Sequence, residues 1–272
     1  MAISELEQLM ESWEKMVLNS LAYNRQHNGE EEHYWEHYAG DYESNRTSGA
    51  HFRHVVEWLA ARIPRDASVL EIGPGPVIFT LPLVERCRLV TVVEPSPSLA
   101  ARIGQTMQWY PNLNIVRKCW EDVFLPSHDF IFSAGTLHLF ADIRGVLEKM
   151  LSHARLKVLL VLLDEDRTFQ QETADALQLN THFPARLLSS LFSQVLECLG
   201  LFFTWETFTE EQTYHYPNID LLINVWQEGM NIDPGRRHDL LTFFRNKGLC
   251  DDIGEQITLP RRFSSHLVEI FV

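Results

Sequence analysis

Hydrophobic and polar residues follow a helical pattern over the first 62 positions of this chain. Residues 3–26 place apolar side chains three and four apart, which gives a helix one apolar face. A second helical stretch carries four aromatic residues, Tyr34, Trp35, Tyr38 and Tyr42. A third spans about residues 51–62 and ends before Pro64. The pattern predicts a helical N-terminal region.

Short apolar runs of strand length then alternate with amphipathic stretches. Strands are expected at residues 68–72, 89–93, 113–118, 129–133 and 157–163. Helices are expected at residues 76–87, after Ser96 and Pro97, and at 142–152. Strands that alternate with helices in short order imply an α/β fold with a doubly wound, mostly parallel sheet.

The pattern changes after residue 166. A helix is expected at 184–199, a long strand at 201–214, two helices at 218–230 and 234–246, and a last strand at 264–272. A late antiparallel strand would let these two strands complete the sheet, with the two helices inserted as a lid. The chain is therefore divided into an N-terminal helical cover (1–62), a ligand-binding core (63–166) and a part that completes the sheet and carries the lid (167–272).

Composition indicates an ordinary globular protein. The chain has 272 residues, of which 45% are hydrophobic and 22% charged. No window approaches the roughly 18 apolar residues that a membrane helix needs. The acidic, amphipathic first residues do not resemble a signal peptide. A soluble, cytoplasmic protein without a membrane partner is expected.

The net charge and the cysteine content limit the classes of partner and of structural site that the chain can have. The net charge is −14, and a nucleic acid is held by the Lys and Arg side chains in which this chain is poor. We therefore expect no nucleic-acid partner and a small, neutral or cationic substrate. The four cysteines include no C-x-x-C pair, which argues against both a disulfide framework and a zinc ribbon.

A glycine turn joins the first two predicted strands and carries the most specific chemistry. Glu71-Ile72-Gly73-Pro74-Gly75 ends the first strand, and Glu94 follows Gly73 by 21 positions, at the tip of the second. The two glycines let the backbone approach a ligand closely, beyond the carboxyl ends of the strands. Glu94 can accept hydrogen bonds from ribose hydroxyls. Glu71 would repel a pyrophosphate and suits a ligand with an ammonium or sulfonium group.

These residues resemble the first two motifs of class I S-adenosylmethionine-dependent methyltransferases. Residues 119–122 and 129–138 resemble two further motifs, so that the likeness covers about residues 34–166. The resemblance implies a Rossmann-like fold, S-adenosyl-L-methionine as cofactor, S-adenosyl-L-homocysteine as product, and methyl transfer to a small-molecule acceptor. The chain departs from the family at residues 153–157, where a Pro-Gly-Gly turn is common.

The resemblance also implies roles for individual residues. Gly73 and Gly75 would hold the methionine end of the cofactor, and Glu94 the ribose. The adenine would lie at Trp120 and Glu121, and the sulfonium near Ala134 and Gly135, under a cover of tyrosines. The complete set of expected cofactor-binding residues is Tyr38, Tyr42, Glu71, Gly73, Pro74, Gly75, Glu94, Pro95, Trp120, Glu121, Ala134 and Gly135.

The acceptor side is less defined. Methyl transfer is an in-line displacement that needs alignment of the acceptor, and a general base only if the acceptor keeps a proton. His138 and His215 are the catalytic candidates, although His138 also fits a hydrogen-bonded buried histidine and His215 an ordinary turn before Pro217. The acidic residues 164–166 end the fifth predicted strand, where one of them could bind a cationic acceptor.

Other functions stay open. A protein that binds the cofactor without catalysing transfer would have the same fold. A dinucleotide-dependent oxidoreductase is disfavoured, because Ile78 stands where that fingerprint has a third glycine. His33 and His37 have metal-ligand spacing, but 12 histidines produce such pairs by chance, so no metal is predicted. The acceptor atom, the use of a general base and the choice between monomer and homodimer are left undetermined.

Overall fold

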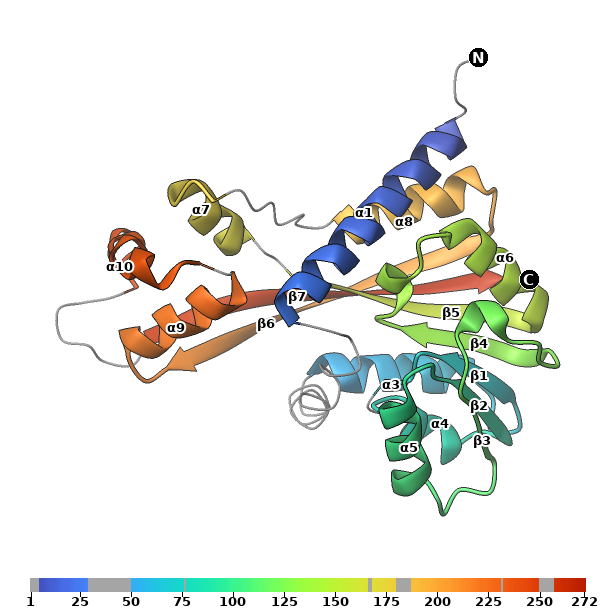
Figure 1. Cartoon of the computed structure of the whole chain (residues 1–272). Helices are drawn as coiled ribbons and strands as arrows, with labels where there is room; N and C mark the ends of the chain where they lie inside the picture. Colours follow the sequence, from blue (N-terminus) through green and yellow to red (C-terminus); the bar gives the residue numbers. More distant parts are fainter. Residues whose placement is uncertain are drawn as a thin grey trace. The chain divides into compact units, whose positions relative to one another are not determined.

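A seven-stranded sheet forms the centre of the computed structural model, which describes residues 5–28, 50–75, 77–165, 168–179, 187–230, 232–249 and 257–272 (Figure 1). The strand order is β3-β2-β1-β4-β5-β7-β6. The strands are β1 (Ser68–Ile72), β2 (Leu89–Val93), β3 (Leu113–Val116), β4 (His128–Ala134), β5 (Ala154–Glu165), β6 (Phe203–Tyr216) and β7 (Ile257–Phe271).

The direction of the strands confirms the predicted fold class. Strand β1 pairs in parallel with β2 and β4, β2 with β3, and β4 with β5. Strand β7 runs against its neighbours β5 and β6 (Figure 1). The sheet is therefore doubly wound and mostly parallel, with one late reversed strand, as the pattern after residue 166 predicts.

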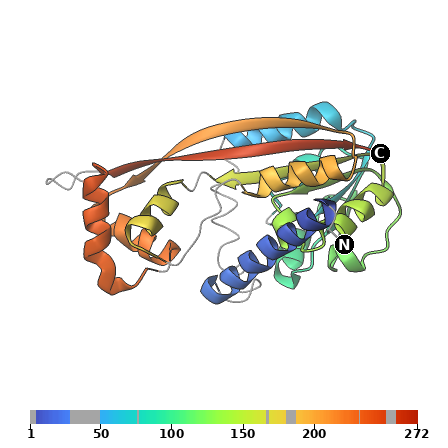
Figure 2. The same ribbon diagram turned by 90° about the horizontal axis from the view of Figure 1, so that it is seen from above.

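Helices cover both faces of the sheet. The α-helices are α1 (Glu5–Asn28), α3 (Ala50–Arg62), α4 (Thr80–Val84), α5 (Pro97–Thr106), α6 (Ile143–His153), α7 (Thr168–Ala176), α8 (Leu187–Cys198), α9 (Ile219–Gly229) and α10 (Arg237–Asn246). The 3₁₀ turns are η1 (Trp120–Asp122), η2 (Leu137–Leu139) and η3 (Pro234–Arg236). Figure 2 shows α1 and α3 on opposite faces of the sheet.

Alternating side chains of the strands build two cores. Leu70 and Ile131 point to the face under α1, α6 and α8, where Trp13 is fully buried. Val69 and Phe130, their neighbours along the strands, point to the opposite face under α3, α4 and α5. A period of two thus buries both faces of each central strand, as a doubly wound sheet requires.

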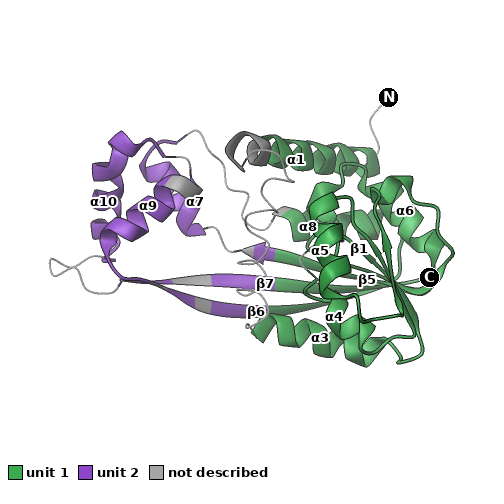
Figure 3. Cartoon of the chain, turned by 60° about the horizontal axis from the view of Figure 1, so that its bottom comes forward, with its two compact units in different colours: residues 1–163, 188–208, 265–272 green, residues 164–187, 209–264 purple. Residues whose placement is uncertain are grey.

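The chain divides into two compact units, coloured separately in Figure 3. Unit 1 comprises residues 1–163, 188–208 and 265–272, and unit 2 comprises 164–187 and 209–264. Unit 2 has a core of its own, in which Trp226 donates a 3.2 Å hydrogen bond from Nε1 to Thr173 Oγ1 and its ring meets Phe244. The lid role of the two late helices stays a prediction.

Several element boundaries differ from those predicted. Helix α4 covers Thr80–Val84, not residues 76–87, because the turn continues through Val77 at φ +62°, outside helical geometry. Strand β5 begins at Ala154, directly after the last residue of α6, so no separate loop stands at the family's Pro-Gly-Gly position. Strand β7 begins at Ile257, earlier than predicted, and α7 was not predicted. The described helices include none that is both long and apolar enough to span a bilayer.

Candidate functional site

The glycine turn leaves β1 in a conformation that only glycine adopts easily. Gly73 has φ +66°, and its N–H donates a 3.0 Å hydrogen bond to Val93 O. A Cβ at Gly73 would lie 2.4 Å from Thr136 Cγ2. Gly75 has φ +55°, with no atom within 4 Å of a Cβ placed there. The turn is thus tight at Gly73 and open at Gly75, where a ligand can approach the backbone.

Glu71 is a buried carboxyl group at the end of β1. The residue is 2% exposed, and Thr80 Oγ1 donates a 2.7 Å hydrogen bond to its Oε2. Burial raises the pKa of Glu71 to about 7; the Thr80 hydrogen bond opposes this shift, and the charge of Glu94 adds to it. A ligand cation beside this group would favour its ionised form and be held by it.

Glu94 follows β2 and is 4% exposed. Its own N–H donates to Val116 O, and its Oε1 accepts a 2.9 Å hydrogen bond from the Ser96 N–H. Ser96 in turn caps α5 through a 3.2 Å bond from the Leu99 N–H to its Oγ. The Glu94 carboxylate is therefore held in place at the start of α5, while Pro95 beside it is exposed.

The end of β4 lies directly against the glycine turn. Ser133 Oγ donates a 3.1 Å hydrogen bond to Ile72 O and also bonds to Thr136 Oγ1. Gly135 has φ +67°, and its N–H donates a 2.8 Å hydrogen bond to Val161 O. The structure thus brings the following predicted residues to one edge of the sheet: Glu71, Gly73, Pro74, Gly75, Glu94, Pro95, Ala134 and Gly135.

Two residues of this edge were missed by sequence reasoning. Thr80 supports Glu71, and Thr136 fills the space that a side chain at position 73 would need. No local pattern marks either threonine, because each acts on a residue of another element. His138, predicted to be catalytic, lies in η2 just beyond Thr136 and is half-buried.

Trp120 and Glu121 are not brought to the glycine turn in the same way. The Trp120 ring is 2% exposed and lies edge-on to His153, with ring centroids 5.5 Å apart. Lys149 Nζ lies 4.8 Å from the centroid of that ring and donates to the carbonyl oxygens of Trp120 (2.7 Å) and Glu121 (2.8 Å). The indole is thus enclosed against the second half of α6, and the Glu121 side chain is exposed. Their role at the adenine stays a prediction.

Several predicted residues cannot be placed at this edge. Tyr38 and Tyr42, and also His33 and His37, lie outside the described residues. His215 belongs to β6 within unit 2, but its side chain is not among those described. In the described part of the chain, no group of three or more His, Cys, Asp or Glu side chains gathers as a metal site would require.

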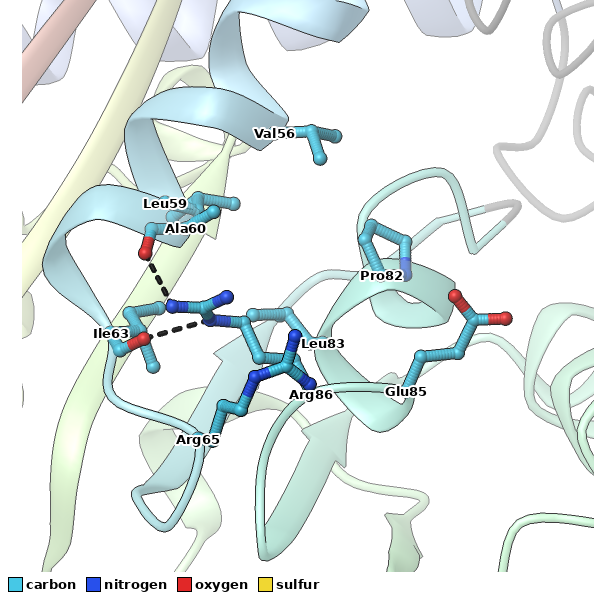
Figure 4. A pocket seen from close by; sticks show the side chains of 9 residues that line it. All are labelled: Val56, Leu59, Ala60, Ile63, Arg65, Pro82, Leu83, Glu85 and Arg86. Carbon is cyan, nitrogen blue, oxygen red and sulfur yellow. Dashed lines mark hydrogen bonds between the residues drawn. The ribbon is translucent and has the colours of Figure 1, made fainter.

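A hollow between α3 and α4 is separate from the candidate site (Figure 4). It has a volume of about 320 Å³ and is lined by apolar residues such as Val56, Leu59 and Pro82. Arg86 crosses it and donates to the carbonyl oxygens of Ile63 (2.9 Å) and Ala60 (2.5 Å) at the end of α3. None of the predicted cofactor-binding residues lines this hollow, and Arg86 has a structural task there.

Solved structures share this architecture. A protein of Bacillus halodurans described as a methyltransferase superposes with a TM-score of 0.56 at 12% identity, over 82% of this chain and 99% of its own. The plantazolicin methyltransferase BpumL, solved in complex with S-adenosylhomocysteine, superposes with a TM-score of 0.53 at 11% identity, over 97% and 99%. The chain has the fold of class I S-adenosylmethionine-dependent methyltransferases.

Sequence comparisons point to one branch of this methyltransferase fold. A family model described as ribosomal RNA adenine dimethylase matches residues 47–124. The ribosomal RNA small subunit methyltransferase A of Corynebacterium glutamicum is 48% identical over 57 residues, which are 21% of this chain and 19% of that protein. A probable enzyme of the same name from Pyrobaculum aerophilum is 30% identical over 123 residues, 45% of this chain and 48% of that protein. The likeness thus spans at most about half the length of these relatives.

The residues at the edge of the methyltransferase fold fit the cofactor that the fold implies. The open space at Gly75 is the place where a side chain would obstruct a ligand, and Gly73 allows the turn that creates it. Glu71 and Glu94 are two buried acids on neighbouring strands, which suits a ligand that carries both a cation and hydroxyl groups.

Proposed function

We propose that this chain is an S-adenosylmethionine-dependent methyltransferase that acts on a small molecule. The observation that carries the proposal is the pairing of two buried carboxyl groups, Glu71 and Glu94, around a glycine turn at the carboxyl edge of a methyltransferase-fold sheet. Two acids in one buried place are costly unless a cation or hydroxyl donors join them. S-adenosylmethionine carries both.

Each residue at this carboxyl edge of the sheet then has its own role in binding the cofactor. The backbone at Gly73 and Gly75 admits the methionine end, and Glu94 accepts hydrogen bonds from the ribose hydroxyls. Glu71 supplies negative charge near the ammonium or sulfonium group, and Ala134 and Gly135 adjoin the sulfonium. When bound, the cofactor supplies an activated methyl group, so that the protein needs chiefly to align the acceptor and exclude water. Tyr38 and Tyr42 would form the cover, and Trp120 and Glu121 would meet the adenine.

The acceptor is proposed to be a small molecule, for which His138 and His215 are candidate bases. A net charge of −14 is unfavourable for holding a phosphate backbone. A ribosomal RNA adenine acceptor is the second candidate, because the family model for that class matches residues 47–124. This match includes the glycine turn and Glu94 but ends before β4, so it bears on cofactor binding more than on the acceptor.

Titration calorimetry tests the cofactor. S-adenosylmethionine and S-adenosylhomocysteine should both bind the full chain, and Glu94→Ala should weaken binding at least about tenfold, or 1.4 kcal/mol. Glu148→Gln is the matched control, since Glu148 is an exposed acid paired with Arg144 on α6. Absence of binding for both ligands would reject the proposal. Equal affinity of Glu94→Ala and the parent would remove the ribose role.

A transfer assay separates the remaining candidates. The full chain is incubated with S-adenosylmethionine labelled in the methyl group, together with small-subunit ribosomal RNA or with a small-molecule cell extract. Label in the extract fraction alone supports the small-molecule proposal, and label in the RNA supports the second candidate. Cofactor binding without transfer to either fraction would favour a non-catalytic cofactor-binding protein.

A further inference from the structure

The first turn of α3 lies beside the glycine turn. The ring of Phe52 stacks on that of Phe79, with centroids 5.7 Å apart and planes 25° apart. Phe79 closes the glycine turn and meets Phe132 of β4 edge-on, also at 5.7 Å. These contacts fix the start of α3 at the carboxyl edge of β1 and β4, where the proposed cofactor site lies.

The second half of β7, from Ser265 onward, also begins at this edge of the sheet, beside β5. Strand β7 runs antiparallel to β5, and the Val272 N–H donates to Leu156 O near the start of β5. Ser265, seven residues earlier on β7, is therefore near Leu163, seven residues further on β5. Leu163 adjoins the site, because a Cβ placed on Gly135 would lie 3.3 Å from Leu163 Cδ1.

A serine and a histidine meet between these two elements. Ser265 Oγ is hydrogen-bonded to Nδ1 of His51, the second residue of α3. Ser265 is 2% exposed and His51 is half-buried. One turn later, His54 stacks on Phe208 of β6 with ring centroids 4.4 Å apart and planes 16° apart. The first two turns of α3 are thus held against β6 and β7, and the His51 ring has a defined orientation.

The ion pairs of this face lie at the other end of the helix. Glu269 binds Arg62, the last residue of α3, and Lys157 of β5. Arg62 is eleven positions from His51, about 16 Å along a helix. The His51–Ser265 pair is therefore separate from that charged cluster, and the cluster does not explain it. All of these residues belong to unit 1, as does the glycine turn.

We propose that His51 is a catalytic residue on the acceptor side of the site and that Ser265 is the positioning residue that orients it. The inference rests on the proposed function and names its base. The acceptor nucleophile forms a bond to the methyl carbon while the carbon–sulfur bond breaks and leaves its electron pair on sulfur. The proton of the acceptor passes to Nε2 of His51 in the tautomer in which Nδ1–H donates to Ser265 Oγ, and the resulting imidazolium returns that proton to solvent.

An NMR titration tests this placement without knowledge of the acceptor. The imidazole Cε1–H signals of the full chain are followed against pH in saturated complexes with S-adenosylmethionine and with S-adenosylhomocysteine, and loss of one signal in His51→Gln assigns His51. Because only the first ligand has a positive sulfur, the pKa of His51 should be lower in that complex by about half a unit to one unit. His128 is the internal control, since it lies at the start of β4, bound to Thr91 and Pro126, and should titrate equally in both complexes.

Two variants test the positioning role. Ser265→Ala should shrink the difference in the His51 pKa between the two complexes, and Ser265→Thr, which keeps the hydroxyl, should retain it. Equal His51 pKa values in the two complexes of the parent protein would overturn the proposal. An unchanged difference in Ser265→Ala would overturn the role of Ser265. If calorimetry shows that neither ligand binds, the proposed function fails instead, and the two failures are distinguishable.

Discussion

Thr80 Oγ1 donates a 2.7 Å hydrogen bond to the carboxyl group of Glu71, a residue that is only 2% exposed. This bond offsets part of the free-energy cost of removing the carboxyl group from water when the chain folds. Burial nevertheless raises the pKa of Glu71 to about 7. Near neutral pH, Glu71 therefore populates both its protonated and its ionised form, at the place where a cationic ligand is proposed to bind.

The stability of the ligand-free protein should fall as pH rises through neutrality. The folded-state pKa of Glu71, about 7, is above its ordinary value of 4.5, so folding favours the protonated form. The contribution is complete below about pH 4.5 and is lost as pH rises through 7, at most about 3 kcal/mol. Urea unfolding at pH 5 and pH 8 should show this loss in the parent and a smaller one in Glu71→Gln. Parallel pH profiles for the two proteins would contradict the shifted pKa.

Gly73→Ala should destabilise the protein by about 2 kcal/mol or more, because the new Cβ meets a positive φ and a close neighbour together. That neighbour is Thr136 Cγ2, 2.4 Å away. Thr136→Ser removes this methyl group and should restore part of the loss in the double variant. Gly75→Ala, with φ +55° but no atom within 4 Å, should cost only about 1 kcal/mol. Thermal unfolding of the four proteins checks the order, and equal losses for both glycines would argue against the close approach.

Trp120→Phe should cost much less stability than Trp120→Ala, because most of the buried ring is kept. Among the described residues, the buried indole Nε1–H has no hydrogen-bond partner, so its loss removes no bond seen there. Trp120→Ala should instead cost about 3–5 kcal/mol, because the ring is 2% exposed against α6. Calorimetry on Trp120→Phe also tests the adenine role. Unchanged affinity for S-adenosylhomocysteine would indicate that the ring has a structural role. Weaker binding with little change in stability would instead support contact between the indole and the adenine.

Glu269 should show the opposite pH dependence to Glu71. Burial acts to raise its pKa, but the hydrogen bonds and charges of Lys157 and Arg62 outweigh burial and lower the pKa overall. Its stabilisation is present above the ordinary pKa of a glutamate and is lost as pH falls through the lowered value. Glu269→Gln should therefore lose stability at pH 7 and differ less from the parent in acid, measured by urea unfolding. A larger difference in acid than at pH 7 would contradict the ion pairs.

Local patterns were sufficient for the alternating core. Strands β1 and β2 occupy the predicted residues 68–72 and 89–93, because short, mostly apolar runs between turn residues have few alternatives inside an α/β domain. Ser96 caps α5 as predicted, since a serine before proline at the first helical position is a strong local signal. The acids at the ends of these two strands follow from the same register, and parallel pairing brings both to one edge.

Contacts between distant segments were beyond the reach of these patterns. The predicted helix at 76–87 was too long because Val77 adopts a positive φ, which no local propensity of valine suggests. The resemblance implies a place for Trp120 at the adenine, which stays a prediction, but no local pattern indicated that its ring packs against α6. The His51–Ser265 bond joins residues 214 positions apart, so neither residue carries a local sign of the other.

The class of fold, the glycine turn and the two acids beside it can be predicted from local patterns, since each depends on short-range periodicity and on the register of neighbouring parallel strands. The side chains that support that turn come from distant segments and are identified by the folded structure alone. Thr136 approaches Gly73 because the strand order places β4 beside β1, and Ser265 meets His51 because the reversed strand β7 returns under α3. Such partners are selected by the packing of whole elements, which is a property of the complete chain and not of any segment of it.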